Sequence, residues 1–449
     1  MHSTDDVSQN FAITFNLSDG FAGFTYSMLS ELQDEYSKTP ALLWAAAWGE
    51  SALAHSTIDK EAWSRDRLKR FNTRGMNTAI SMALMVDCAP SSRLLTPLFG
   101  LQTAGMPQDA LPSRYKPSNI YHTSALLSAH LETATLPLRL LRSPGSGGES
   151  AADLSLRLNR RNDMPIATLS GCAPTPLLAE VFDERAKSKD PIELLLAAKG
   201  YMPKEKPTVG SRWSPEQDAI RAAGSIRSAW VNFSGAKLGK SGTSPAVVPF
   251  AQSVVARDSD ANAASPTLAA IEQIHHLASG GRAVIDEMAF KASFTSHAYN
   301  VPDSFPNFFS GLTDDGRRLP ASLRSSSSKS SRPNTLPLIS SLSTTPETYY
   351  LLRSAKQVVH EAITGHLPLH MYGIGSGTGG ASAVAAANEE SEGIVGGRDG
   401  LKEIRERLED MVGVYESGLP GDLRSDEEDD GKGTDEEWVA DDQDEWDLE

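Results

Sequence analysis

A glycine-rich segment near the carboxyl end has the residue types of a phosphate cradle. Residues 372–382 read Tyr-Gly-Ile-Gly-Ser-Gly-Thr-Gly-Gly-Ala-Ser, and closely spaced backbone amides of this kind can bind phosphate oxygens. The segment lacks the Lys-Ser/Thr ending of a P-loop, and no acidic residue follows a clear second strand about twenty residues on. We therefore interpret it as a flexible linker, with a phosphate cradle as the alternative.

Histidines and cysteines are the other candidates for chemistry. The group closest to a zinc helix comprises His360, Glu361, His366 and His370. Metalloprotease spacing places two histidines four residues apart on one helix, whereas Gly365 and Pro368 interrupt the helix here. We interpret these histidines as solvated or core residues and expect no metal. The pair His275-His276 has no cysteine nearby, and two small, buried residues without a catalytic signature are expected at Cys88 and Cys172.

Hydrophobic periodicity predicts alternating helices and strands. Apolar residues at helical spacing predict helices over 25–36, 76–86 and 118–136, the last ended by Pro137. Short apolar runs predict strands at 41–48, whose alanines also permit helix, at 165–171, with Gly171 as the stop, and at 336–342.

Two further helices are expected near the carboxyl end. A capping box of Thr344 and Glu347, with Pro346 in the first turn, begins the first, and Gly365 ends it. Its apolar face comprises Leu351, Leu352, Ala355, Val358, Val359 and Ile363. The second helix spans about 400–415, with an apolar stripe of Leu401, Ile404, Leu408, Met411 and Tyr415 and with i,i+4 ion pairs Lys402–Glu406 and Glu403–Arg407.

Composition and charge limit the classes of function. The 449 residues suffice for two or three domains, and 39% of them are hydrophobic, which fits a soluble globular protein. The formal net charge is −16, and fifteen acidic residues lie between Asp422 and Glu449 against Arg424 and Lys432. The body is therefore nearly neutral and lacks the clustered basic face of a nucleic-acid-binding protein. We expect no nucleic-acid partner.

Targeting and membrane signals are missing from the sequence. The longest apolar run, Ala41–Trp48, is far shorter than a membrane helix. The start, Met-His-Ser-Thr-Asp-Asp-Val, has no apolar signal core and is unlike a mitochondrial presequence. With two cysteines, a disulfide framework is excluded and a reducing cytosol is the natural setting.

A series of motifs in a fixed order resembles tubulins. Residues 17–36 resemble the glycine-rich phosphate loop and the next helix, 77–82 resemble Tyr-Asn-Ala-Thr-Leu-Ser, and 127–139 resemble the long central helix. Residues 152–174 continue into the intermediate domain, and 336–416 resemble the end of tubulin, with His370-Met-Tyr372 in place of His-Trp-Tyr. Within that superfamily, Asp-Gly-Phe-Ala-Gly-Phe-Thr at 19–25 and the helix up to Tyr36 resemble the Misato family of divergent tubulin/FtsZ-like proteins.

The resemblance implies an α/β fold with four parts. Residues 1–140 correspond to the second part of the nucleotide-binding domain with the central helix, and 141–370 to the intermediate domain. Serine-rich or polar insertions at about 204–213, 234–243 and 323–334 interrupt the latter. Residues 371–421 form the glycine-rich linker and last helix, and 422–449 form a disordered acidic tail.

Two departures from the tubulin pattern bear on GTP hydrolysis. Only sixteen residues precede Leu17, so we expect the first half of the nucleotide domain to be absent, which leaves apolar surface bare beside 41–48 and on the helix at 25–36. The loop that carries Asn-x-Asp-x-x-acid in tubulins has Asp153, but Ala151 replaces the asparagine and Leu156 replaces the acid. Leucine cannot orient an attacking water.

The phosphate loop itself has also changed. Successive glycines let backbone amides approach phosphate oxygens, whereas here Phe21 and Phe24 leave only Gly20 and Gly23. We interpret the segment as a helix N-terminus that the phenylalanines pack, capped by Ser18 or Asp19. The alternative is residual anion binding at Gly20, Gly23 and Thr25.

The resemblance also implies a function. It implies a non-catalytic tubulin-like protein without cofactor, in mitochondrial distribution, organisation and mitochondrial DNA inheritance. Implied partners are tubulin or the cytosolic chaperonin, and implied locations are the cytoplasm and, by peripheral association without a transmembrane segment, the cytosol-facing surface of mitochondria. The alternative is a GTP-binding switch or polymerising GTPase whose amino-terminal half is missing from this gene model.

The acidic tail has two interpretations. A disordered, solubilising tail is the simpler one. Trp438 and Trp446 among the carboxylates are anchors that a purely solvating tail does not need, so a docking peptide is the alternative.

Overall fold

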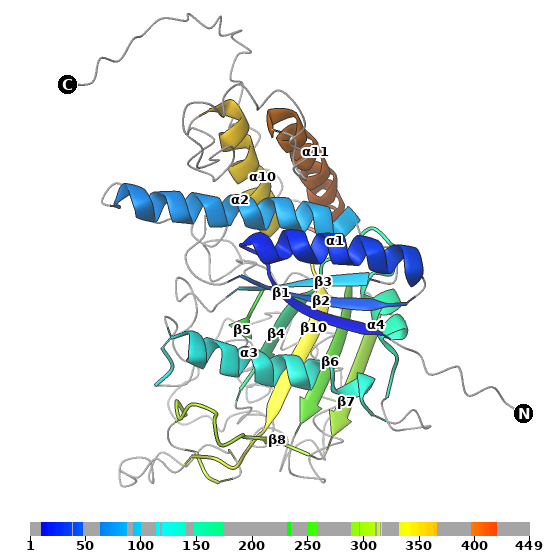
Figure 1. Ribbon diagram of the computed structural model, residues 1–449. Coiled ribbons are helices and arrows are strands. Elements are labelled where there is room, and N and C mark those ends of the chain that lie inside the picture. Colours follow the sequence, from blue (N-terminus) through cyan, green and yellow to red (C-terminus); the bar gives the residue numbers. More distant parts are fainter. Residues whose placement is uncertain are drawn as a thin grey trace, which may run out of the picture.

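The computed structural model describes residues 10–37, 39–47, 63–87, 93–99, 114–116, 119–140, 148–173, 231–234, 249–257, 289–295, 297–309, 312–314, 316, 332–365 and 397–419. Two sheets, with helices packed on them, confirm the α/β class (Figure 1). The glycine-rich segment at 372–382, His275, His276, Cys88, His366, His370 and the acidic tail lie outside the described residues.

Three parallel strands form the first sheet, in the order β1 (Phe11–Asn16), β2 (Ala41–Ala47) and β3 (Arg93–Phe99). The helix α1 (Gly20–Glu35) follows β1, and α2 (Arg65–Asp87) follows β2. All seven residues of β2 are buried, because alternate side chains enter two different apolar clusters. The strand expected at 41–48 is thereby confirmed.

β1 is an edge strand in the described part of the first sheet. Phe11, Ile13 and Phe15 contact the apolar cluster beneath α1 and α2, whereas Ala12 and Thr14 are exposed. The strand β2 itself is fully covered, so bare apolar surface is not seen on residues 41–47.

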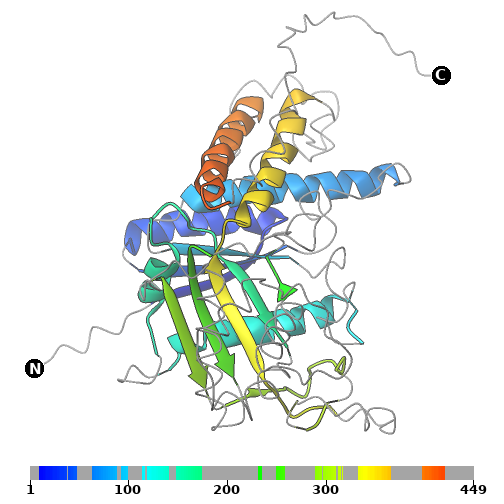
Figure 2. The same cartoon turned by 180° about the vertical axis from the view of Figure 1, so that it is seen from behind.

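The second sheet has the order β5 (Val231–Asn232), β4 (Thr168–Cys172), β10 (Leu338–Thr344), β6 (Ala251–Arg257) and β7 (Phe290–Thr295). Only β6 and β7 are parallel among these neighbours. The helix α3 (Ile120–Ala134) crosses one face of this sheet (Figures 1 and 2). A short pair, β8 (Tyr299–Asn300) and β9 (Thr335–Leu336), lies apart from it.

A single parallel bridge between Leu95 of β3 and Ile166 connects the two sheets. The amide of Leu95 donates to Pro165 O, and the amide of Ala167 donates to Leu95 O, both at 2.8 Å. The short helix α4 (Ala151–Leu158) precedes this junction, and Thr344 Oγ1 at the end of β10 donates to Leu158 O at 2.9 Å.

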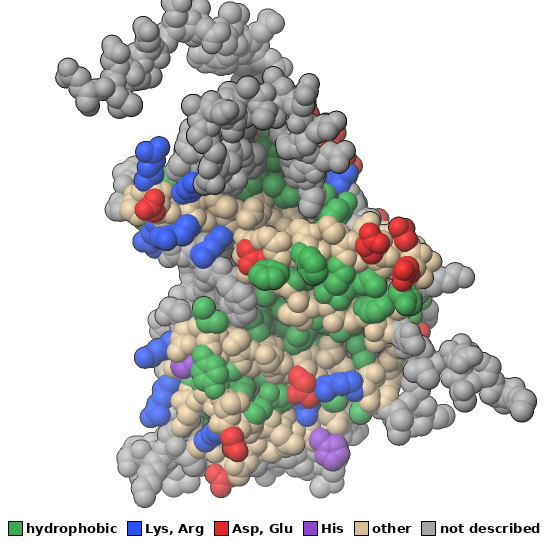
Figure 3. Space-filling model, viewed as in Figure 1, with side chains coloured by type: hydrophobic (Ala, Val, Ile, Leu, Met, Phe, Trp, Pro, Cys, Tyr) green, Lys and Arg blue, Asp and Glu red, His purple; other side chains and the backbone are tan. Residues whose placement is uncertain are grey.

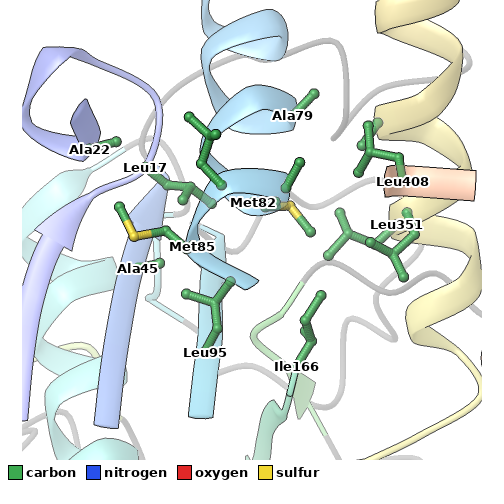
Figure 4. Packing of buried hydrophobic residues seen from close by; sticks show 14 of the residues in the cluster. Leu17, Ala22, Ala45, Ala79, Met82, Met85, Leu95, Ile166, Leu351 and Leu408 are labelled. Atoms are coloured by element: carbon green, nitrogen blue, oxygen red, sulfur yellow. The ribbon is translucent and has the colours of Figure 1, made fainter. Parts of the chain in front are cut away.

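Two helices from the carboxyl end cover α2. These are α10 (Thr348–Thr364) and α11 (Gly397–Glu416), which pack on each other and on the apolar face of α2. Figure 4 shows Leu351 of α10 and Leu408 of α11 near Met82 of α2. The expected apolar stripes of both helices are buried, apart from the partly buried Ile363, and Gly365 ends α10 in the left-handed conformation, with φ 79°.

Several local predictions were wrong, for identifiable reasons. Thr344 continues β10, and Glu347 at the start of α10 forms no side-chain capping bond, so no capping box exists there. Gly171 lies inside β4 and does not end it. The position is occupied by glycine because a Cβ there would overlap the His130 ring and Ile339 O. Pro137 lies in a separate 3-10 turn (Leu136–Leu138) after α3 has ended.

Surface charge pairs on α11 were predicted in part. Arg407 and Glu403 form the expected pair at 2.6 Å. Lys402 instead contacts Asp399, one turn toward the amino end, at 2.9 Å.

Candidate functional site

The junction of β1 and α1 carries the residues that resemble a phosphate loop. Here α1 begins at Gly20, not near Thr25, so Gly20, Gly23 and Thr25 all lie within the helix. Asp19 is the N-cap residue, and its Oδ1 accepts a hydrogen bond from Phe21 N at 3.0 Å. A capping carboxylate also stabilises the positive end of the helix dipole. The expected cap at Asp19 is therefore present.

The cap is held by a network of short polar contacts. Asn16 Nδ2 donates to Asp19 Oδ2 at 2.6 Å, and Asn16 Oδ1 accepts from both the amide and the hydroxyl of Ser18, at 3.0 and 2.9 Å. Asn77 of α2 donates to Ser18 O at 3.2 Å. These side chains satisfy one another and fix the carboxylate of Asp19 at the helix end.

The glycines of this segment do not have the backbone conformation that a phosphate loop requires of glycine. Neither Gly20 nor Gly23 has a positive φ, and a Cβ on Gly20 would contact nothing within 4 Å. Thr25 is buried, and its Oγ1 donates to Phe21 O at 2.8 Å within the helix. At this helix end the Asp19 carboxylate is the group that accepts a hydrogen bond from Phe21 N.

The residues that resemble the second hydrolysis motif of tubulins lie on α4. Asp153 forms a capping box with Ser150: the Asp153 amide donates to Ser150 Oγ at 3.0 Å, and the Ser150 amide donates to Asp153 Oδ2 at 3.1 Å. Leu156, at the position of the acid, is 56% exposed. The one polar residue retained from the motif thus serves to start a helix, and its neighbour offers no group to orient water.

The phenylalanines of the loop do not pack inside the protein. Phe21 and Phe24 are 68% and 69% exposed, respectively, so the expected packing of the helix N-terminus by these rings was wrong. Hydrophobic side chains are visible over α1 in Figure 3. Residues three apart on a helix share a face, so the two exposed rings lie on one face of α1.

Part of the chain is similar to known proteins. A profile of the Tubulin domain family matches residues 3–140. The protein DML1 of Gibberella zeae is 32% identical over 164 residues, which cover 36% of this chain and 29% of that protein. The protein misato of Drosophila melanogaster is 31% identical over 146 residues, covering 31% and 23%, respectively. Over these residues the chain is similar to the proteins DML1 and misato.

Each match covers only part of this chain and only part of the relative. The human protein misato homolog 1 is 30% identical over 145 residues, which again cover 31% of this chain and 23% of the relative. The chain therefore matches about a quarter of the length of these Misato relatives. Its fold is tubulin-like, with the parallel sheet and helices described above.

The histidines and cysteines that were considered as candidates for chemistry do not gather in the described part of the chain. His360 and Glu361 lie on α10, and Cys172 is buried in β4. In the described part of the chain, no three His, Cys, Asp or Glu side chains gather in a way that could hold a metal ion. None of the helices described is long and apolar enough to cross a membrane.

Sequence reasoning missed a basic stripe on the amino-terminal half of α2. Arg67, Arg70 and Arg74 line a cavity of about 360 Å³ together with Phe71. The statement that the body lacks clustered basic residues was therefore wrong for this helix. The i, i+3, i+7 spacing was visible in the sequence, but the helix was expected to begin only at Met76, so its charged first turns were not considered.

Proposed function

We propose that this chain is a non-catalytic tubulin-like protein that acts by binding other proteins. The observation that carries the proposal is the Asp19 carboxylate, which caps α1 where a phosphate group would bind. Like charges at the same helix end repel each other, and the Phe21 amide is already occupied. Leu156 and the capping role of Asp153 support the same conclusion on a second element.

The role we propose for this binding is in mitochondrial distribution, organisation and mitochondrial DNA inheritance. It rests on the family resemblance, with tubulin or the cytosolic chaperonin as partners and the cytoplasm and cytosol-facing mitochondrial surface as locations. The exposed pair Phe21 and Phe24 supports a protein-binding role, because exposed aromatic rings with an apolar surround are typical of interaction sites.

Nucleotide binding is the first test. We expect equilibrium dialysis of the purified chain with GTP and magnesium to detect no stoichiometric binding at micromolar GTP. The variant Asp19→Asn keeps the capping oxygen but removes the negative charge. GTP binding by this variant alone would show that repulsion by the carboxylate, and not the shape of the loop, prevents binding in the wild-type chain. Micromolar binding by the wild-type chain would overturn the proposal in favour of a GTP-binding switch or polymerising GTPase.

The binding role has its own test in cells. We expect the double variant Phe21→Ser/Phe24→Ser to impair mitochondrial distribution and to lower recovery of tubulin or chaperonin with the chain. Leu156→Ser is the matched control, because Leu156 is also more than half exposed but lies on α4. Normal distribution and unchanged recovery with the double variant would refute a role for this surface.

A further inference from the structure

The first turns of α2 concentrate positive charge in a chain whose net charge is −16. Residues 65–74 contain five basic side chains against Asp66, namely Arg65, Arg67, Lys69, Arg70 and Arg74. Arg67 and Arg70 are exposed, and Arg74 is half-buried. Among the described residues, no carboxylate pairs with Arg70 or Arg74. We call the side chains of Arg67, Arg70 and Arg74 the arginine stripe.

The arginine stripe already has one aromatic neighbour. The Arg67 guanidinium lies 4.1 Å from the centre of the Trp63 ring, and Trp63 meets the buried Phe71 edge to face at 5.1 Å. The cavity of about 360 Å³ along the stripe is within the range of ~300–1,000 Å³ that is usual for ligand sites. Its walls therefore offer guanidinium groups for carboxylates and an apolar floor for a ring.

The stripe is accessible in the fold. The amino-terminal end of α2 extends past α1 and the first sheet in both views of the molecule (Figures 1 and 2). Lys and Arg side chains gather on the same end of the helix in Figure 3. The described chain ends just after α11, whose Tyr415 bonds to Ile166 at the junction of the two sheets, and α11 also packs on α2.

We propose that the arginine stripe is the docking site of this chain's own acidic segment, Asp422–Glu449. Charge complementarity selects this occupant: the segment carries fifteen of the chain's acidic residues and two basic ones. Guanidinium groups bind carboxylates through two parallel hydrogen bonds, and they also stack on indole rings. Trp438 and Trp446 lie among the carboxylates, so the segment supplies both kinds of partner.

The length of the tether permits this contact. The described part of the chain ends at Leu419, nineteen residues before Trp438. For a polypeptide of nineteen residues, random-coil statistics give a root-mean-square end-to-end distance of about 22–26 Å, and full extension gives roughly 60 Å. The 23-residue helix α2, on which α11 packs, is about 34 Å long from end to end. The acidic segment can therefore reach the stripe from any point where α11 meets α2.

The docking has consequences beyond the binding role proposed above. A basic partner of the acidic segment has to compete with the arginine stripe, so the segment is partly withheld from it. Exposed charge pairs weaken with salt, because the Debye length falls from about 10 Å at 0.1 M to about 3 Å at 1 M. The indole contacts are less sensitive to salt, so part of the docking persists at high ionic strength.

Zero-length crosslinking of the full chain tests the proposal. A carbodiimide joins lysine amines to carboxylates that are in contact, and Lys69 lies beside Arg70. We expect peptides that link Lys69 to residues 422–449 in the monomer fraction, and a several-fold lower yield in Arg70→Gln/Arg74→Gln. Arg70→Lys keeps the charge and adds an amine, so a new crosslink from position 70 is expected.

The control is Arg114→Gln/Arg160→Gln, which makes the same change of charge at exposed residues outside α2. Melting temperatures of all variants show that they are folded. Equal crosslinking in the stripe and control variants would overturn the proposal, as would crosslinks found only in dimers. Retention of RNA that depends on the stripe, with unchanged crosslinks, would assign the stripe to nucleic acid instead and overturn it as well.

Discussion

Tyr415 near the end of α11 exchanges two hydrogen bonds with Ile166. The tyrosine hydroxyl donates to Ile166 O, and Ile166 N donates to the same hydroxyl oxygen, both at 3.0 Å. The neighbours Pro165 and Ala167 bond to Leu95 of β3, so the polar groups of Ile166 itself face α11. One side chain thus fastens the last described helix to the junction of the two sheets.

Removal of this hydroxyl is expected to destabilise the fold. Tyr415→Phe leaves a buried amide and a buried carbonyl without a partner, which costs about 1–3 kcal/mol for each group left unsatisfied. Urea denaturation measures the loss. Tyr350→Phe is the control, since Tyr350 is only partly buried on α10. Equal stability of both variants would show that water or backbone movement replaces the lost bonds.

His130 is expected to make stability depend on pH. Its fully buried ring packs against Phe233 with the ring planes tilted by 43°, and burial lowers its pKa from 6.5 to about 3. Between these values the unfolded state binds a proton that the folded state does not. The free energy of unfolding therefore decreases as the pH falls below 6.5, by up to about 1.4 kcal/mol per pH unit from this group.

The variant His130→Asn separates this effect from other titrations. Asparagine can still hydrogen-bond toward Ser340 but cannot be protonated in this range. We expect the variant to be less stable at pH 7.5 and to lose less stability than the wild type between pH 7 and pH 5. Parallel pH profiles for the two proteins, obtained by denaturant titration, would refute the assignment to His130.

Two glycines are expected to respond in opposite directions to alanine. Gly171→Ala places a Cβ against the His130 ring and Ile339 O, which we expect to cost about 1–3 kcal/mol. A Cβ at Gly413, in the last turn of α11, contacts nothing within 4 Å, so Gly413→Ala is expected to stabilise by about 0.5–1 kcal/mol. Thermal melts of both variants check the pair, and a stable Gly171→Ala protein would contradict the predicted overlap.

The Asp19 cap is expected to depend on its oxygen more than on its charge. Asp19→Ala removes the acceptor for Phe21 N and costs about 0.5–2 kcal/mol, whereas Asp19→Asn retains an acceptor and changes stability little. Gly20→Ala is expected to be near neutral, because nothing lies within 4 Å of its Cβ position. A large loss from Gly20→Ala would reveal a close contact that the structure does not show.

The sequence predicted those helices and strands whose apolar residues recur at regular spacing within the element itself. The apolar stripe of α10, together with Gly365 after it, indicated the helix and its end, and both are as expected. The run at 41–48 indicated a buried strand despite its alanines. In these cases the pattern within one element was enough to predict it, because the residues that are buried or that end the helix lie close together in the sequence.

Predictions failed where a distant contact decides the structure. Thr344 has the type and spacing of a capping residue, but pairing with Ala251 and the bond to Leu158 O keep it in β10. Gly171 looked like a strand end, but the space occupied by His130 on α3 requires glycine inside β4. The pairing of β4, β10 and β6 joins segments far apart in the sequence, and no single-sequence pattern encodes it.

At the candidate site, the residue types were identified but their roles were only partly predicted. Asp19 was expected as a possible cap from its position before Gly20, and this is confirmed. The exposure of Phe21 and Phe24 was not expected, because apolar rings usually indicate packing, and their surroundings depend on how α1 lies over β1. The arginine stripe was missed because the charges of the first turns obscure the apolar period that defines α2.

The packing of α10 and α11 on α2 sets an order of events during synthesis on the ribosome. The apolar face of α2, with Met82, is complete when Asp87 has been added, but Leu351, which covers it, follows roughly 260 residues later. At ~5–20 residues per second this interval is about 13–50 s. The strands of the first sheet are thus complete early in translation, whereas the side of α2 that α10 and α11 cover in the fold waits for these helices over this whole interval.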